Sequence, residues 1–439
     1  MVELAPKNVR NSLAKHILAD GLDLVFDLEE SRGTRLVDAQ TGKRYLDFFM
    51  FFASSPLGHN HPRMRDPKLL KRMGEVAIHN PSNSDVYTTV MADFVETFAS
   101  VALPDTHPHL FFVAGGSLAV ENALKTAFDW KVRKNLAAER GEIGSQVLHF
   151  KEAFHGRSGY TLSLTNTSDP RKTKYFPKFD WPRVLNPKLE FPLDEPRLRK
   201  VIEAEKESVA QIEQAFADRD GDIAAIILEP IQCEGGDNHF RPEFFQELRR
   251  LADQHEALLV FDEVQTGLGG TGKTWCYEHY DCEPDIVAFG KKTQVCGIFA
   301  NRRIDEVPNN VFQESSRINS TWGGNLVDMA RSQAFLEVIR EESLIENSAK
   351  QGQRLLEKLQ ALANRHSGWM SNVRGQGLLV AFDLPSGEHR DRLLGRLFEE
   401  GMLALACGDQ SVRFRPPLDV EAEAIEEAGQ ILDRVLERF

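Results

Sequence analysis

The 439-residue sequence has few of the features that mark disulfide-rich, metal-binding or membrane proteins. Its cysteines are odd in number and scattered, without paired spacing, which argues against a disulfide framework or a metal site and for reduced thiols inside a cell. No apolar run approaches the length of a membrane span, and the N-terminus shows no apolar core followed by a small-residue cleavage site. These absences predict a cytoplasmic protein without a bound metal. The cysteines are Cys233, Cys276, Cys282, Cys296 and Cys407.

Basic residues are the scarcer charged type, with 53 Lys and Arg against 66 Asp and Glu, which gives a formal net charge of -13. Because phosphate backbones attract basic surfaces, this balance argues against a general nucleic-acid binder. The sequence also lacks internal repeats and low-complexity linkers. Its length and its 41% hydrophobic content predict a large core divided between two lobes.

Strands alternate with helices from about residue 85 to residue 325. Strands are expected at 109–113, in "DIAAIILEP" and in "ALLVFDEV", and helices at 118–134 and from Pro242. The two quoted runs are apolar throughout, which is typical of strands buried on both faces of a sheet. The alternation predicts an α/β fold with a mostly parallel sheet between helices.

The two ends of the chain differ from this middle part in their predicted pattern of strands and helices. "GTRLVDAQTGKRYLDFF" predicts an antiparallel hairpin that turns at Thr41 and Gly42. From Ser332 onward the sequence is rich in helices, with short strands in "GLLVAFDLP" and "SVRFRPP". We therefore expect a large domain at 85–331, a small C-terminal domain at 332–439, and an N-terminal segment at 1–84 that joins the small domain.

The segment "GLGGTGKT" (267–274) fits the P-loop pattern of nucleotide-binding proteins. Two features argue against that function. Pro284 leaves little room for the helix that should receive the phosphate, and Gln265 and Thr266 separate the glycines from the preceding strand. We interpret the segment as a glycine-rich turn, and a nucleotide-binding protein remains the remote alternative.

Three features further along the predicted sheet suit a different ligand. Gly116 and Ser117 stand between a strand and a helix N-terminus, where free N–H groups bind phosphate. Asp262 ends one buried strand, and Lys291 and Lys292 follow Gly290 at the end of the next. One connection between parallel strands would bring Asp262 and a lysine to the same rim of the sheet. Pyridoxal phosphate requires such a set: a lysine for the Schiff base, an Asp for the pyridine nitrogen and a helix N-terminus for the phosphate.

These residues lie in a longer stretch that resembles a known family. "LVFDEVQTGLGGTGKTWCYEHYDCEPDIVAFGKK" is similar to the signature of the class III (ω-) aminotransferases, which are fold-type I pyridoxal phosphate enzymes. The resemblance runs from "YLDFFMFFASSPLGHNHP" through "FHGRSGY" and "EPIQCEGG" to "RFRPP". In that family the Schiff-base lysine follows the small residue that ends the strand. The resemblance therefore selects Lys291 and leaves Lys292 as a bystander in the turn.

The resemblance also implies the cofactor contacts. Gly116 and Ser117 match the phosphate loop, and Phe154 matches the aromatic residue that stacks on the cofactor ring. Asp262 matches the partner of the pyridine nitrogen, and Gln265 matches the residue that contacts the phenolic oxygen.

A further match implies a dimer. Thr321 in "NSTWGGN" corresponds to a threonine that reaches the phosphate of the neighbouring subunit, so we expect a homodimer with active sites at the interface. His155 is expected to be a structural neighbour, because a released Lys291 can itself move the proton.

Three charged residues match the family's substrate contacts. Arg413 in "VRFRPPL" corresponds to the arginine that pairs with an α-carboxylate, and Glu234 to the glutamate that covers it. Arg157 is the candidate second carboxylate clamp.

The motifs are most similar to family members that act on L-lysine. They imply transfer of its ε-amino group to 2-oxoglutarate, which gives L-glutamate and 2-aminoadipate 6-semialdehyde. Ornithine or 4-aminobutyrate as donor is the alternative, and a pyridoxal phosphate decarboxylase or mutase is more remote. "KTQVCG" replaces the run of glycines that many relatives have after the lysine, which weakens the inference about the substrate.

Overall fold

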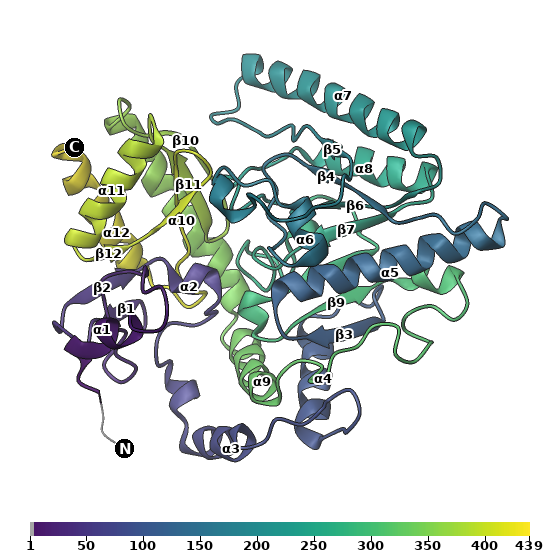
Figure 1. The fold of residues 1–439 in the computed structure, drawn as a ribbon. Helices are drawn as coiled ribbons and strands as arrows, with labels where there is room; N and C mark the ends of the chain where they lie inside the picture. The colour runs from purple at the N-terminus through teal and green to yellow at the C-terminus, as the bar shows by residue number, and fades with distance from the viewer. Residues whose placement is uncertain (1–3) are drawn as a thin grey trace.

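The computed structural model describes residues 4–439 and is organised around a seven-stranded sheet (Figure 1). The strand order is β3-β9-β8-β7-β6-β4-β5, and only β9 runs antiparallel to its neighbours. The predicted α/β fold with a mostly parallel sheet is confirmed. The strands are β3 (His109–Val113), β4 (Gln146–Phe150), β5 (Arg183–Val184), β6 (Ile223–Leu228), β7 (Leu258–Asp262), β8 (Ile286–Phe289) and β9 (Cys296–Ala300).

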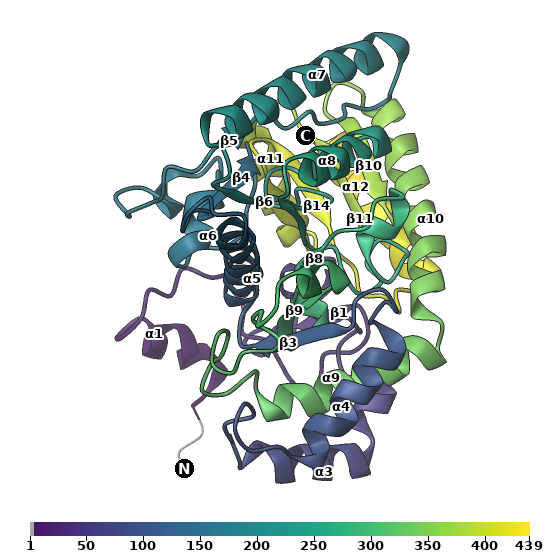
Figure 2. The same cartoon turned by 90° about the vertical axis from the view of Figure 1, so that its right-hand side faces the viewer.

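Helices cover both faces of this sheet because its strands are apolar on both sides. Val260 of β7 packs in one cluster with Val120 and Trp130 of α5 (Gly116–Ala137). The next residue, Phe261, belongs to the opposite cluster with Phe245 of α8 (Pro242–Gln254). Figure 2 shows α5 and α8 on different sides of the central strands. Helices α4 (Thr89–Val101), α7 (Glu195–Asp218) and α9 (Leu326–Glu341) lie on the α8 side, and α6 (Gly159–Leu164) lies beside α5.

The C-terminal part forms a second, smaller sheet with the antiparallel order β10-β11-β14-β13. Helices α10, α11 and α12 pack with it and with one another. The elements are α10 (Leu344–Arg365), β10 (Ser371–Gln376), β11 (Leu379–Asp383), α11 (Gly387–Glu399), β13 (Leu405–Cys407), β14 (Ser411–Phe414) and α12 (Ala422–Glu437).

The predicted N-terminal hairpin is confirmed, with β1 (Arg35–Val37) antiparallel to β2 (Arg44–Asp47). Strand β12 (Met402–Leu403) adds to β2 in parallel, so the N-terminal segment joins the C-terminal part, as Figure 1 shows in purple and yellow. The domain boundaries remain a prediction, and α9 runs unbroken across residues 331 and 332.

Shorter elements connect these parts of the fold. In α2 (Met50–Ala53) all four residues have positive φ angles, a left-handed turn that costs roughly 1–2 kcal/mol per residue. The others are α1 (Val9–Leu13), α3 (Pro67–Ala77) and the 3₁₀ turns η1 (Pro6–Asn8), η2 (Pro62–Arg65), η3 (Pro170–Lys172), η4 (Cys276–His279), η5 (Lys291–Thr293) and η6 (Arg302–Glu306).

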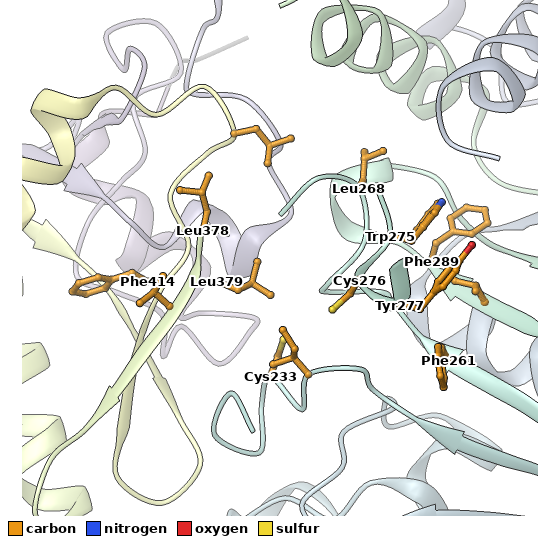
Figure 3. Close-up of a cluster of buried hydrophobic side chains, with 14 of the residues drawn as sticks. Cys233, Phe261, Leu268, Trp275, Cys276, Tyr277, Phe289, Leu378, Leu379 and Phe414 are labelled. Carbon is orange, nitrogen blue, oxygen red and sulfur yellow. The ribbon is translucent and has the colours of Figure 1, made fainter. Parts of the chain in front are cut away.

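One hydrophobic cluster connects the two sheets. Figure 3 shows Leu378, Leu379 and Phe414 of the C-terminal part on one side, and Phe261 and Phe289 of β7 and β8 on the other. Because these side chains pack together, the carboxyl ends of β7 and β8 lie beside the C-terminal sheet. The candidate site forms along this junction.

The glycine-rich segment 267–274 packs against α10 and does not form a P-loop. It is followed by the short turn η4, and no helix begins there to receive a phosphate. Gly272 has φ +84°, and a Cβ at this position would lie 2.9 Å from the Cβ of Ala349 in α10. The glycine therefore allows a close approach between backbone and helix. The interpretation as a glycine-rich turn is confirmed, and the nucleotide-binding alternative loses its structural basis.

Residues 4–439 contain neither a membrane-spanning helix nor a metal-binding cluster. No helix in this range is both long and apolar enough to cross a membrane. Within the same range, no three His, Cys, Asp or Glu side chains cluster in a way that could hold a metal ion.

Candidate active site

Asp262 and Lys291 lie at the ends of adjacent parallel strands. Asp262 is the last residue of β7 and is paired with Ala288 of β8. Strand β8 ends one residue later, and Lys291 opens the turn η5 after Gly290. The predicted common rim is confirmed, although the connection between the strands carries the short turn η4 in place of a long helix.

Lys291 has an unusual backbone and electrostatic environment. Its φ of +52° lies in the left-handed region, which a non-glycine residue occupies only where surrounding structure enforces it. Burial lowers the pKa of the Lys291 ammonium group, the charge of Asp262 opposes that shift and the charge of Arg413 adds to it. A lowered pKa increases the fraction of free amine, the form that attacks a carbonyl.

Lys292 is buried, with 4% of its surface exposed. Its Nζ donates a hydrogen bond to the Gln265 carbonyl oxygen over 3.2 Å. Burial is the main cause that lowers the pKa of Lys292 to about 7, and the Arg415 charge contributes. Lys292 lies in the turn η5, as expected for the bystander lysine. Its hydrogen bond to Gln265 also connects this turn to the segment after β7.

Asp262 is held by two neighbours. Its Oδ2 is 2.8 Å from His155 Nδ1, and its Oδ1 accepts from the Val264 N–H over 3.0 Å. Asp262 and His155 are both buried, and His155 Nε2 has no hydrogen-bond partner among residues 4–439. The sequence interpretation treated His155 as a structural neighbour, and the structure shows that its neighbour is the Asp262 carboxylate.

A second carboxylate, which the sequence analysis missed, lies behind the site. Glu229 follows β6, and its carboxylate accepts from the Phe154 N–H over 2.8 Å and from the Cys233 N–H over 3.2 Å. Burial raises the pKa of Glu229 well above its usual value, and the Asp262 charge adds to the shift. Its position after a buried parallel strand is the same signal that pointed to Asp262.

The N-terminus of α5 forms a polar cradle. Gly115 caps the helix without a side-chain hydrogen bond, which leaves backbone N–H groups of the first turn available. Ser117 Oγ contacts the hydroxyls of Ser158 and Thr161, the latter at 2.8 Å. A Cβ on Gly116 would lie 2.8 Å from Val264 Cγ1, so the close approach requires glycine. This cradle suits a phosphate.

The substrate residues show one difference from expectation. The resemblance implied that Glu234 covers Arg413, but Glu234 Oε1 instead pairs with Lys172 Nζ and accepts from Thr167 Oγ1 over 2.8 Å. Arg413 Nη1 donates to Gln265 Oε1 over 3.0 Å. The implied pair is not formed in this structure: Glu234 pairs with the Lys172 ammonium group, and the Arg413 guanidinium binds the neutral Gln265 amide.

The structure does not bring Arg157 and Thr321 into this set. Both are exposed, and Arg157 forms no ion pair within residues 4–439. Thr321 lies in the loop before α9, where the carbonyl of the next residue, Trp322, accepts from the Asn83 side chain over 2.8 Å. Their predicted roles remain predictions.

The side chains around Lys291 fit pyridoxal phosphate. Asp262, oriented by His155, offers a buried carboxylate for a protonated pyridine nitrogen, and the α5 N-terminus offers donors for the phosphate. Phe154, half-buried with its backbone fixed by Glu229, offers an aromatic face for the ring. When bound, the cofactor supplies an electron sink for the carbon that carries the amine. The chain supplies the lysine, the charge and the orientation.

Comparisons with known proteins agree with this site. A family model described as aminotransferase class-III matches residues 18–436. The L-lysine-epsilon aminotransferase of Mycobacterium tuberculosis is 53% identical over 425 residues, which cover 96% of this chain and 94% of that protein. The enzyme of the same name from Amycolatopsis lactamdurans is 51% identical over 428 residues, covering 97% and 95%.

The fold was also compared with solved structures. A lysine aminotransferase from M. tuberculosis in the internal aldimine form matches with a TM-score of 0.97 and 51% sequence identity. The match covers 99% of this chain and 100% of that chain. The chain therefore belongs to the class III aminotransferases, which depend on pyridoxal phosphate.

Proposed function

We propose that the protein transfers the ε-amino group of L-lysine to 2-oxoglutarate. The products are L-glutamate and 2-aminoadipate 6-semialdehyde, which cyclises to piperideine-6-carboxylate. The names of the similar proteins from M. tuberculosis and A. lactamdurans support lysine as the donor. Ornithine and 4-aminobutyrate are the alternative donors.

The observation that carries the proposal is a buried guanidinium without a carboxylate partner. Arg413 is 3% exposed, its Nε has no hydrogen-bond partner, and no acidic side chain within residues 4–439 pairs with it. The neighbouring Arg415 differs, because its guanidinium pairs with the equally buried Asp237. A buried cation with only an amide partner favours an incoming carboxylate. Arg413 lies close enough to Lys291 for its charge to shift the pKa of the lysine.

The end of the substrate that reacts depends on whether Arg413 is free. With lysine as donor, we propose that Glu234 moves onto Arg413, so that the distal amine meets Lys291 and Arg157 binds the remote α-carboxylate. With 2-oxoglutarate, Glu234 stays away and Arg413 binds the α-carboxylate. Glu234 Oε2 is buried without a partner in this structure, which leaves one oxygen available for that exchange.

A panel of amino donors tests the proposal. We expect kcat/KM with L-lysine and 2-oxoglutarate to exceed that with ornithine by at least about tenfold, since one methylene in a fitted pocket is worth roughly 10–200-fold. Glutamate formation measures the rate, and mass spectrometry identifies the cyclised product. A higher kcat/KM with ornithine or 4-aminobutyrate would move the assignment to that donor.

We also propose a homodimer, for which exposed apolar side chains are the support. Trp322, beside Thr321, is 52% exposed, and Leu118, beside Ser117, is 41% exposed. Phe52 of the left-handed turn is 53% exposed and Tyr175 is 89% exposed. In a dimer, the partner subunit would cover the side chains that flank Ser117 and Thr321.

Thr321→Ala tests the contribution of the second subunit. If Thr321 reaches the partner's phosphate, the variant should lose cofactor faster on dialysis, and the dimer should dissociate more readily after that loss. Analytical ultracentrifugation measures both states. A monomeric enzyme that retains its cofactor would contradict the contact between subunits.

A cytoplasmic location completes the proposal. All five cysteines are free thiols in the structure, and four of them are buried. Free thiols suit a reducing compartment. Fractionation of cells that express the tagged protein tests this location.

A further inference from the structure

The partner of Glu234 in this structure is a lysine that no sequence motif indicated. Lys172 is the last residue of the 3₁₀ turn η3, and its Nζ forms an ion pair with Glu234 Oε1. The side chains of Lys172 and Glu234 are 31% and 19% exposed, so the pair is partly shielded from water. Lys172 Nζ also lies 5.9 Å from the centre of the Phe154 ring, which places it at the mouth of the cofactor site.

The turn that carries Lys172 is well defined. Asp169 caps η3 by accepting from the Arg171 N–H over 3.1 Å, and Pro170 occupies the first turn. Arg171 pairs with Asp169 and is 89% exposed, so the charge beside Lys172 is directed to solvent. Lys172 is therefore presented to Glu234 by a short, capped turn.

Glu234 is anchored through only one of its oxygens. Lys172 Nζ and Thr167 Oγ1 both contact Oε1, and Nζ is also 3.5 Å from Thr167 Oγ1. Oε2 is buried and has no partner. The Glu234 backbone is fixed separately, because its carbonyl accepts from the Gly408 N–H over 2.8 Å. The side chain can thus change partner while its backbone stays docked on the C-terminal sheet.

In the exchange proposed above, Lys172 and Arg413 compete for the Glu234 carboxylate. Arg413 lacks an acidic partner, and Arg415 cannot serve because Asp237 already holds it. We infer that Lys172 is a positioning residue that holds Glu234 away from Arg413. This is the state in which Arg413 can bind the α-carboxylate of a five-carbon dicarboxylate such as 2-oxoglutarate. This inference rests on the proposed exchange of Glu234 onto and off Arg413, which we call the gate. It adds that the ion pair with the Lys172 ammonium group keeps Glu234 off Arg413 and so leaves Arg413 free.

Lys172→Met removes this hold and should act opposite to Glu234→Ala. Without its ammonium partner, Glu234 spends more time on Arg413, and the dicarboxylate must displace it. We expect the Kd of glutarate, an unreactive dicarboxylate, to rise about three- to tenfold. A rise of this size corresponds to the loss of one charged hydrogen bond of modest strength. In the glutamate half-reaction KM should rise by a similar factor while the limiting rate is retained.

Matched variants distinguish the specific ion pair of Lys172 with Glu234 from a general effect of removing a positive charge. Lys174→Met removes a lysine two residues away whose Nζ lies over Tyr175, so glutarate affinity should not change. Lys172→Arg keeps a cation and should preserve most of the affinity. Calorimetry on the cofactor-loaded enzyme measures glutarate binding, and stopped-flow measures the half-reactions. Equal glutarate affinity in the Lys172→Met and Lys174→Met variants would overturn the inference.

A double variant distinguishes the two levels of the proposal. If Lys172 acts through Glu234, then Lys172→Met should have no effect on glutarate affinity in the Glu234→Ala background. The same three- to tenfold loss in that background would make Lys172 a direct substrate ligand and overturn the inference. If Glu234→Ala alone leaves glutarate affinity unchanged, the gate itself fails. If Glu234→Ala binds glutarate more tightly but Lys172→Met in the otherwise unchanged enzyme has no effect, only the role of Lys172 is overturned.

Discussion

The ends of β7 and β8 and the loop around Glu234 are two polar regions of one site, built differently. At the strand ends, Asp262 closes the buried strand β7 and is held by His155 and by the Val264 N–H. In the loop, Glu234 is partly exposed and pairs with Lys172, and one of its oxygens has no partner within residues 4–439. The first region has one arrangement, whereas the exchange of Glu234 proposed above gives the second region two.

We expect this difference to separate the residues that carry out the reaction from the residues that select the substrate. A buried carboxylate held by two partners keeps its position because leaving it unpaired is costly. A carboxylate shared between cations changes position for a small free-energy difference, which an incoming substrate can supply. Substitutions at the strand ends should therefore remove activity with every donor, whereas substitutions around Glu234 should redistribute activity between donors.

The largest effect is expected at Lys291. Lys291→Ala should lose the visible absorption of covalently attached cofactor, and turnover should fall by at least roughly 10²–10⁴-fold because the group that moves the proton is absent. Lys292→Ala should retain the absorption. Absorption spectra of the two purified variants make the test. Retained absorption in the first variant and loss in the second would shift the site by one residue.

Asp262→Ala should have the next largest effect. The fold should persist, while turnover with lysine and with glutamate should fall together, by about ten- to a hundredfold or more for a charged hydrogen bond of about 1.5–3 kcal/mol. Circular dichroism reports the fold, and steady-state rates report the loss. Near-normal rates would reduce Asp262 to a structural cap.

Lys292 should make stability depend on pH. Its pKa is lowered to about 7 in the folded chain. Between that value and its usual value the unfolded chain binds the proton and the folded chain does not, so this contribution to stability rises with pH and is lost as pH falls toward 7. Lys292→Met removes it. The stability of the variant relative to the parent should therefore decrease by about 2 kcal/mol from pH 7 to pH 9. Denaturant unfolding at both pH values measures the free energy of unfolding of variant and parent. A variant that does not lose stability relative to the parent between pH 7 and pH 9 would contradict the prediction.

Glu234→Ala should have the smallest effect, but a selective one. Losing the carboxylate leaves Arg413 open to every α-amino acid, so the lysine half-reaction should slow while the glutamate half-reaction is kept or improved. The ratio of the two rates should change by at least roughly tenfold. Stopped-flow with each donor measures the ratio. Equal slowing with both donors would mean that Glu234 does not select between substrates.

The strand ends could be predicted from sequence, and the loop partners could not. Asp262 and Lys291 end continuous apolar runs, and the order of a parallel sheet brings such positions to one rim. Glu229 carries the same signal and could have been found. His155 and Lys172 carry no such signal, because their contacts join segments distant in sequence. The pair of Glu234 and Arg413 that the resemblance implied is not formed in this structure, where Glu234 pairs with Lys172 of the 3₁₀ turn η3.

The sheet that joins β2 to β12 has a consequence for the order in which the enzyme is made. Beside this sheet, the ion pair from Arg35 of β1 to Glu427 of α12 spans 392 positions of sequence. At about 5–20 residues per second, a ribosome needs roughly 20–80 s to synthesise that interval. Arg413 belongs to the same late segment, and the Arg415 N–H bonds the Phe48 carbonyl over 2.8 Å. A nascent chain can thus complete the strands that carry Asp262 and Lys291 before Arg413 is synthesised, so the residue proposed to bind the substrate carboxylate is the last of the three to join the site.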